Sequence, residues 1–272
     1  MNAAVDMMNP TATAQPAAGH IRRQYLLGTP LCLTSYDQFI HHCRGLAQQR
    51  GTTSVDFSNT QIVTMRRHDA AFRRLTSRVD YFVPDGMPLI WCLNLLGAGL
   101  RDRVYGPKFM HHFLSTDDWG GKHYLLGGSE ECVGRLEVVF HQKNPGLRIV
   151  GARNGYFLSE EESSIVEEIN RISPDFIWVG LGTPRQQRWI HENRDRIHRG
   201  VIFAIGFAFD VNAGTKPDAP MWMQRLGLTW VFRLASEPTR LGPRYLCYNS
   251  LFLGYLILDA LRRKAFTGTE AS

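Results

Sequence analysis

Cysteine is scarce in this chain of 272 residues, and the cysteines form no recognisable pattern. There are five, an odd number, and no two of them stand as Cys-x-x-Cys. This excludes a small disulfide-stabilised scaffold and gives no sign of a zinc site or a redox dithiol. A reducing compartment is the simplest interpretation.

Several nucleotide- and metal-binding motifs are also missing. The chain contains neither Gly-x-Gly-x-x-Gly nor a phosphate-binding loop ending in Gly-Lys-Ser/Thr. The first absence counts against a Rossmann-type oxidoreductase, which is kept as a rival enzyme class. Asp-x-Asp is absent too, and the adjacent Asp117 and Asp118 are poor ligands for a metal-bridged sugar nucleotide. We therefore predict no metal ion and no cofactor.

No hydrophobic run reaches the roughly 20 residues that span a bilayer. The nearest, 245–261, is interrupted by polar residues and is followed by Arg262, Arg263 and Lys264. An apolar helix with a basic end suits a membrane surface, and a core or subunit-contact helix is the alternative. Residues 1–20 lack the basic start and apolar run of a secretory signal, so we predict a disordered leader over 1–24.

Positive charge is in excess and is unevenly placed. The chain is 44% hydrophobic, as a folded protein requires, and carries a formal charge of +6. From Thr215 onward eight Lys or Arg face four Asp or Glu, so +4 of the +6 lies in the last fifth of the sequence. A basic protein suits an anionic membrane or a phosphorylated substrate. A nucleic-acid partner would rest on the charge alone, and we predict none.

Apolar runs and helical patterns alternate along most of the chain. The runs are near-continuous, as buried parallel strands are. From about Thr215 the alternation stops and helical patterns dominate. We therefore predict a Rossmann-like α/β domain over 25–214, a mostly parallel sheet with helices on both faces, and a basic helical appendage over 215–272. The predicted strands are 53–57, 79–83, 123–126, 147–150, 175–180 and 201–205, and the predicted helices are 61–77, 129–143, 159–172 and 184–197.

Four loops that follow predicted strands could carry chemistry, because parallel α/β sheets bind ligands at the carboxyl ends of their strands. The first contains Asn59, which could hydrogen-bond a ligand or simply cap the following helix. The second contains Asp85, which is either a general base or a turn residue. The other two are rich in glycine and could bring a phosphate or ribose close to backbone N–H groups. They contain Gly127 and Gly128, and Gly180, Gly182 and Gln186.

Other polar residues have simpler explanations. The pairs Arg66–Arg67 and Arg73–Arg74 lie on a predicted helix and are interpreted as a solvated face. His68, His111 and His112 are interpreted as surface residues. Ser159 with Glu162 three residues later resembles a capping box at a helix start.

A dozen ordered blocks between residues 30 and 248 resemble the WecG/TagA/CpsF glycosyltransferase family. They include Pro-Asp-Gly-Met-Pro-Leu at 84–89, Arg-Val-Tyr-Gly at 103–106, Gly-Leu-Gly-Thr-Pro-Arg-Gln at 180–186 and Gly-Phe-Ala-Phe-Asp at 206–210. Further blocks are Ala-Pro-x-Trp at 219–222, Gly-Leu-Thr-Trp at 227–230, Arg-Leu at 233–234, Glu-Pro at 237–238 and Arg-Tyr at 244–245.

The resemblance implies an inverting transferase that needs no metal. Its donor would be a UDP-sugar and its acceptor a polyprenyl-diphosphate-linked saccharide at the cytoplasmic membrane face. Asp85 would be the catalytic base, and Asn59 and Gln186 would bind the donor, as would the glycine loops. Arg233, Arg240 and Arg244 would engage the acceptor diphosphate, and their spacings of seven and four place them near one helical face.

The chain departs from the family pattern at several positions. Phe57 stands where the family often has Thr, Gln187 replaces a Glu, and Asp218 and Thr229 replace an Arg and a Glu. The donor of the better-known members, UDP-N-acetylmannosamine, therefore need not apply. We expect UDP-glucose and exopolysaccharide assembly, with the N-acetylmannosamine donor as first alternative and a non-enzymatic membrane-associated assembly factor as second. Homo-oligomerisation is left open.

Overall fold

The computed structural model describes residues 21–267, with side chains to Arg262. Its centre is an eight-stranded sheet in the order β1-β2-β4-β3-β8-β7-β5-β6. Every pairing in it is parallel except that of β1 with β2. The prediction of a mostly parallel sheet is confirmed. The strands are β1 (Arg23–Leu26), β2 (Thr29–Cys32), β3 (Gly51–Ser58), β4 (Tyr81–Pro84), β5 (Lys122–Gly127), β6 (Arg148–Arg153), β7 (Phe176–Gly180) and β8 (Arg199–Ala204).

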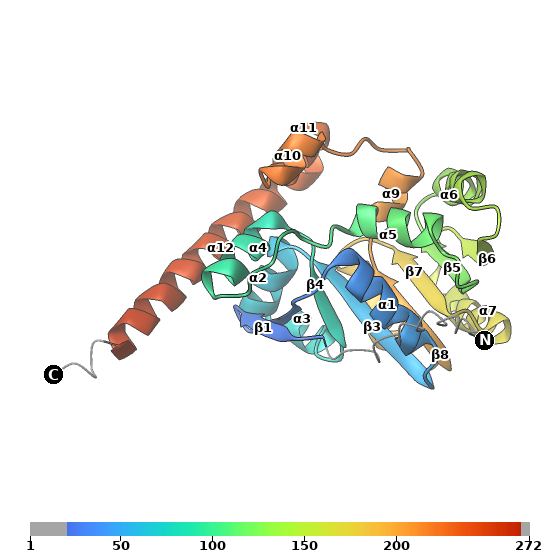
Figure 1. The fold of residues 1–272 in the computed structure, drawn as a ribbon, viewed down its shortest axis with the longest axis horizontal. Coiled ribbons are helices and arrows are strands. Elements are labelled where there is room, and N and C mark those ends of the chain that lie inside the picture. The colour runs from blue at the N-terminus through green and yellow to red at the C-terminus, as the bar shows by residue number, and fades with distance from the viewer. Residues whose placement is uncertain (1–20, 268–272) are drawn as a thin grey trace, which may run out of the picture.

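Helices cover both faces of the sheet, as predicted (Figure 1). One core cluster joins the inward residues of α1, α5, α6 and α9 to side chains such as Phe203 of β8. The cluster on the other face joins α7 and α8 to the alternate residues of the same strands, for example Ile202. The helices are α1 (Tyr36–Ala47), α2 (Thr60–His68), α3 (Ala70–Leu75), α4 (Met87–Leu95), α5 (Gly106–Ser115), α6 (Glu130–Lys143), α7 (Glu162–Ile172), α8 (Arg185–Asn193) and α9 (Ala208–Asn212).

The start of the chain differs from the prediction. Residues 1–20 of the predicted leader lie outside the described residues, but Ile21 is buried and β1 begins at Arg23, still within 1–24. The hairpin to β2 turns at Leu27 and Gly28, both with positive φ. Sequence analysis misses it because such turns are signalled by Asn-Gly or Asp-Gly, and here the first position is a leucine.

The helix predicted over 61–77 is two helices. Asp69 separates α2 from α3 in an extended conformation, and its side chain caps α3 by accepting from the N–H groups of Ala71 and Phe72. The capping box predicted at Ser159 and Glu162 is also wrong. Glu161 accepts from the N–H of Leu158 at 2.8 Å, and Ser159 begins a short 3₁₀ turn before α7.

The interpretation of Arg66 as a solvated residue is wrong. Its side chain is 7% exposed, and its guanidinium lies 4.2 Å from the ring centroid of Phe82. It donates to the hydroxyl of Thr29 and to the carbonyl of Thr76. Arg66 therefore ties α2 to β2 and to the turn after α3, while Arg73 and Arg74 are exposed as expected.

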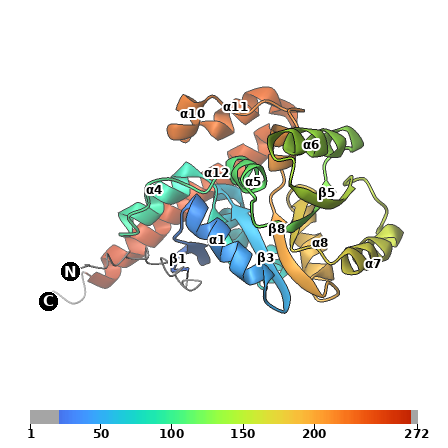
Figure 2. The ribbon, with the colours of Figure 1, turned by 45° about the vertical axis from the view of Figure 1, so that its right-hand side comes forward.

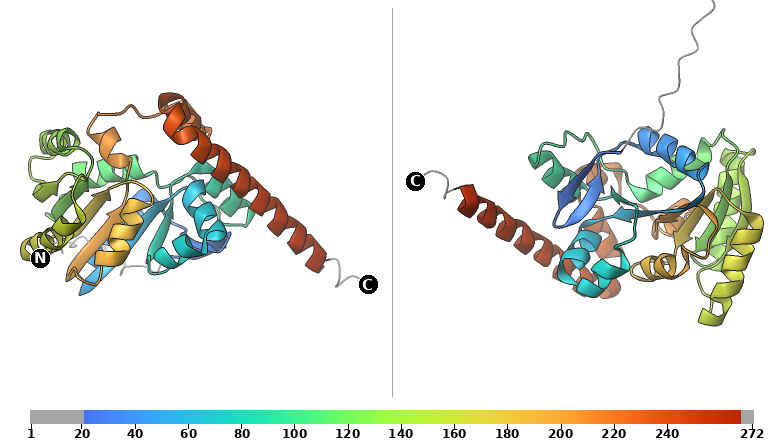
Figure 3. Two further views of the ribbon diagram at one scale, coloured as in Figure 1. Left: turned by 180° about the vertical axis from the view of Figure 1, so that it is seen from behind. Right: turned by 90° about the horizontal axis from the view of Figure 1, so that it is seen from below.

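The region predicted as an appendage consists of three helices, α10 (Met221–Arg225), α11 (Thr229–Ser236) and α12 (Pro238–Thr267). In Figure 2, α10 and α11 lie together at the top of the molecule, beyond the strand ends. Helix α12 runs along the α/β body and extends past it (Figure 3). It packs on α2 through Arg67–Asp259 and His68–Tyr255 contacts. Within residues 21–267 no helix is both long and apolar enough to cross a membrane.

Candidate active site

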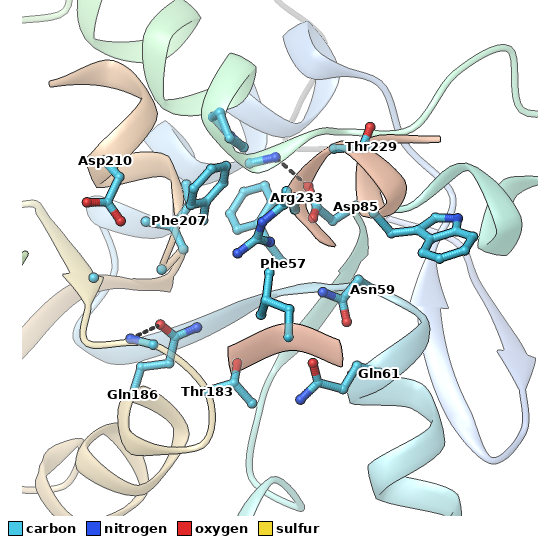
Figure 4. A pocket seen from close by; sticks show the side chains of 18 of the residues that line it. Phe57, Asn59, Gln61, Asp85, Thr183, Gln186, Phe207, Asp210, Thr229 and Arg233 are labelled. Atoms are coloured by element: carbon cyan, nitrogen blue, oxygen red, sulfur yellow. Dashed lines mark hydrogen bonds between the residues drawn. The ribbon is translucent and has the colours of Figure 1, made fainter. Parts of the chain in front are cut away.

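A cleft of about 680 Å³ opens at the carboxyl edge of the sheet. One wall is built from the loops that follow β3, β4, β5, β7 and β8, and the other from α11 and the first turns of α12. Asn59, Asp85, Gln186 and Arg233, all predicted site residues, line it (Figure 4). Arg240 and Arg244 line it as well. This juxtaposition follows from the topology, since parallel strands end at one edge of their sheet.

Asp85 follows β4 directly and is held by three backbone interactions. Its own N–H donates to the carbonyl of Ser58, and its Oδ1 accepts from the N–H of Gly106 at 2.6 Å. Arg103 donates to its backbone carbonyl. Burial raises the pKa of the Asp85 carboxyl, while Arg103, the Gly106 N–H and Arg233 oppose the rise. The described residues give Oδ2 no hydrogen bond, so that oxygen is available to accept a proton.

Asn59 is both an N-cap and a cleft residue. Its Oδ1 accepts from the N–H of Ile62 and caps α2, which is the structural alternative that the sequence leaves open. Its amide group nevertheless lies at the cleft wall. Among the described residues its Nδ2 has no acceptor, so that atom can donate to a ligand.

The glycine loops are shaped by close backbone packing. A Cβ on Gly127 would lie 2.4 Å from the backbone of Gly180, and one on Gly180 would lie 2.6 Å from the Phe209 ring. Gly128, Gly180 and Gly182 line the cleft, whereas Gly127 is not among the lining residues. The N–H of Gly128 already donates to the Gly180 carbonyl. These glycines thus let two strand ends approach, and fewer of their N–H groups are free than the sequence suggests.

The two glutamines at the start of α8 point to different places. Gln186 accepts from the N–H of Gly182 at 3.1 Å and lines the cleft. Gln187 lies beneath, 3% exposed, and donates to Asp56 Oδ2 at 2.8 Å. Ser58 donates to the other oxygen of Asp56. The pKa of Asp56 is raised by burial, and the two hydrogen bonds oppose that rise.

Arg233, Arg240 and Arg244 converge on the cleft, although they do not share one helical face. Arg233 belongs to α11 and the other two to α12, and Glu237 between them has a non-helical conformation (φ −139°, ψ 62°). The guanidinium of Arg233 lies 3.9 Å from the Phe207 ring centroid. Burial lowers the pKa of Arg244, and the charges of Arg240 and Arg233 lower it further.

Sequence analysis gives Arg103 no role of its own. It is 6% exposed and bridges two elements, because it donates both to the Asp85 carbonyl and to Thr229 Oγ1 at 3.2 Å on α11. Trp230, Tyr245 and Asn249 also line the cleft. They belong to α11 and α12, which lie outside the pattern of strands and strand-end loops, so no strand-end argument could have found them.

In the part of the chain that the structure describes, no group of three or more His, Cys, Asp or Glu side chains could hold a metal ion. Metal independence stays a prediction. Asp117 is used structurally, since it accepts from buried His123 at 3.1 Å and pairs with Arg44.

The sequence profile of the glycosyl transferase WecG/TagA/CpsF family matches residues 24–266. The chain belongs to this family. It is 25% identical over 220 residues to the N-acetylglucosaminyldiphosphoundecaprenol N-acetyl-beta-D-mannosaminyltransferase of Staphylococcus aureus (strain MW2), covering 80% of this chain and 86% of that one. It is 26% identical over 209 residues to the enzyme of the same name from Bacillus subtilis (strain 168), covering 76% and 80%.

These relatives change the expectation about the donor. Their names specify an N-acetylmannosaminyl group, a lipid-diphosphate-linked N-acetylglucosamine acceptor and a β-linked product. They favour the first alternative of the sequence analysis over its main expectation of glucose. Membership in the family establishes a glycosyltransferase.

Proposed function

We propose that this glycosyltransferase moves an N-acetylmannosamine-type sugar from a UDP donor onto a polyprenyl-diphosphate-linked N-acetylhexosamine. The observation that carries the proposal is a carboxylate with one free oxygen, Asp85, in a cleft that also gathers three arginines. The arginines suit an anionic acceptor, and the carboxylate suits the activation of its hydroxyl group.

Asp85 would accept the proton of the acceptor hydroxyl as that oxygen attacks the anomeric carbon. The bond to UDP breaks on the opposite face, so an α-linked donor gives a β-linked product. One base is sufficient for this path, whereas retention would require a second carboxylate as nucleophile. The raised pKa supports this role, because a base works best when its pKa approaches the working pH. Gly106 holds Oδ1, which fixes the carboxylate while Oδ2 takes the proton.

The diphosphate of the acceptor would lie against Arg233, Arg240 and Arg244. Burial lowers the pKa of Arg244 and the charges of Arg240 and Arg233 lower it further, and a bound dianion would offset the repulsion among these three cations. Guanidinium groups bind phosphate oxygens in pairs, which orients as well as attracts the acceptor. The UDP-sugar would occupy another part of the cleft, near Gly128, Gly182 and Gln186. Asn59, which also lines the cleft, can donate a hydrogen bond to it from its side-chain amide.

The membrane contact belongs to the same proposal. On α12 four large apolar side chains are 60% or more exposed: Leu246, Leu253, Ile257 and Leu261. Their spacings of seven, four and four place them along one stripe of the helix. We place this stripe at the cytoplasmic face of the membrane, where the lipid of the acceptor is anchored. Sedimentation with anionic vesicles tests it, and substitution of Leu253 and Ile257 by Ser is expected to reduce binding.

A transfer assay tests the donor and the reaction together. The purified protein is given a polyprenyl-diphosphate-linked N-acetylglucosamine and, separately, UDP-N-acetylmannosamine, UDP-N-acetylglucosamine and UDP-glucose, with products identified by mass spectrometry. We expect the mass gain of one N-acetylhexosamine from the first donor. Transfer of a hexose from UDP-glucose alone would restore glucose as the donor. Failure with every donor, in protein that binds UDP and the acceptor, would refute the transfer that we propose.

A further inference from the structure

An aromatic pair lies in the cleft wall that α11 and α12 provide. Trp230 and Tyr245 both line the cleft, and their rings meet edge to face, with centroids 6.3 Å apart and planes at 89°. Trp230 is 41% exposed, so part of the indole is open to the cleft. Among the described residues, neither the indole N–H nor the Tyr245 hydroxyl has a hydrogen-bond partner. This corner therefore presents an apolar ring surface with free polar edges.

The pair is flanked by groups that the proposed function assigns to the acceptor. Arg233 is three residues after Trp230 on α11 and thus on the same side of that helix, and Arg244 directly precedes Tyr245. Thr229, which directly precedes Trp230 on α11, is linked through Arg103 to the carbonyl of Asp85. The aromatic pair thus lines the same cleft as the cations that suit a diphosphate and as Asp85, whose pKa Arg233 already influences.

We propose that Trp230 and Tyr245 form a platform for the pyranose ring that is attached to the acceptor diphosphate. The inference rests on the proposed function, since it takes the arginines as the diphosphate site. A pyranose has one face of C–H groups, which packs on an aromatic ring, and equatorial hydroxyls that can bond to the polar ring edges. Stacking there would hold the acceptor sugar with its attacking hydroxyl toward Asp85.

Backbone packing holds the platform in place before the acceptor arrives. Gly227 begins the turn into α11 with a φ of +69°, and a Cβ there would come within 2.7 Å of the Trp91 ring on α4. The close approach of this turn to α4 fixes the start of α11, and therefore Trp230. Such preorganisation reduces the entropy that binding would otherwise cost.

The chain supplies a matched control. Trp222 lies on α10, is 60% exposed, and is not among the cleft-lining residues. If exposed tryptophans served only to contact lipid, replacing either one would have the same effect. A soluble acceptor analogue with a short prenyl chain removes the membrane from the measurement altogether.

The experiment compares two ligands by titration calorimetry without vesicles: N-acetylglucosaminyl diphosphate carrying the short prenyl chain, and the same prenyl diphosphate without sugar. Trp230→Ala is expected to weaken the sugar-bearing ligand about tenfold, the scale of one lost aromatic contact. Binding of the bare diphosphate and of UDP should be unchanged, which also shows that the variant is folded. Trp230→Phe should restore most of the affinity, and Trp222→Ala should bind like the wild type.

Three outcomes would overturn the platform. For Trp230→Ala they are an unchanged affinity for the sugar-bearing ligand, an equal loss of affinity for the bare diphosphate, and a loss of UDP affinity. The last would mean that Trp230 contacts the uracil ring of the sugar-nucleotide donor. These outcomes concern ligand binding by the variants. The proposed function depends instead on transfer by the wild-type protein, and it stands if that transfer is observed. A wild-type protein that neither binds the sugar-bearing ligand nor transfers to it would refute both.

Discussion

Replacing Asp85 by Asn separates the chemistry of the carboxylate from its place in the fold. Asparagine keeps an oxygen that can accept from the Gly106 N–H, so the loop geometry should survive. It cannot take the proton of the acceptor hydroxyl. Loss of a positioned base lowers turnover by about 10²–10⁴-fold, and we expect a fall in that range in single-turnover assays with saturating donor and acceptor.

The stability of the same variant should move in the opposite direction. Burial raises the pKa of Asp85 in the folded protein, so ionisation of this group disfavours folding. Below the pKa of the unfolded chain both residues are neutral and the two proteins should unfold alike. As the pH rises from the unfolded pKa through the folded pKa, the free energy of unfolding of the wild type falls, because a buried carboxyl must ionise. The Asn variant has no such group, and its stability does not fall for this reason. We therefore expect the variant to be as stable or more stable at neutral pH.

Two measurements decide the matter. The wild-type kcat/KM should fall on the acid side with an apparent pKa above the ordinary value of about 3.9 for Asp, and urea unfolding of both proteins should be followed across the same pH range. The reasoning is refuted if Asp85→Asn turns over within a few-fold of the wild type. It is equally refuted if the variant loses activity only because it unfolds.

Two further substitutions address the arginines and the buried network. Arg240→Ala should raise the acceptor KM by about 10–100-fold, the value of a charge-assisted hydrogen bond, and leave UDP affinity unchanged in calorimetry; equal losses would place Arg240 at the donor. Gln187→Glu replaces the amide that donates to Asp56 at 2.8 Å by a second buried carboxyl. The pair must then share a proton, so the variant should lose about 1–3 kcal/mol of unfolding free energy, and more as the pH rises. Urea unfolding at acidic and neutral pH measures this, and a loss that grows toward acid pH would contradict it.

The sheet was predictable because its buried strands leave a strong local signal. Runs such as Phe176–Gly180 are apolar throughout, and helical patterns separate them, which is typical of a parallel sheet covered on both faces. The β1–β2 hairpin left no such signal. Its strands have four residues each, and β1 carries Arg23, Gln24 and Tyr25, of which Tyr25 is 68% exposed.

The site was predictable to the extent that strand ends define it. Asn59 and Asp85 follow neighbouring strands, and Gln186 is the second residue of the helix after β7, so topology alone brings them to one edge. Arg66 and Arg103 show what this approach misses. An arginine beside a helical pattern gives no sign that its guanidinium is buried on Phe82 or bridges the Asp85 loop to helix α11, because those contacts depend on tertiary packing.

The three arginines converge on one cleft although the expectation about their helix is wrong. The sequence spacing places Arg233, Arg240 and Arg244 near one face of a single helix. The break at Glu237 makes two helices instead, and the chain turns between them so that Arg233 approaches from α11 and Arg244 from α12. Two helices can present guanidinium groups from different directions around a diphosphate, whereas one face would line them up along an axis. The break also brings Trp230 of α11 against Tyr245 of α12, so the same local change that separates the arginines creates the aromatic corner beside them.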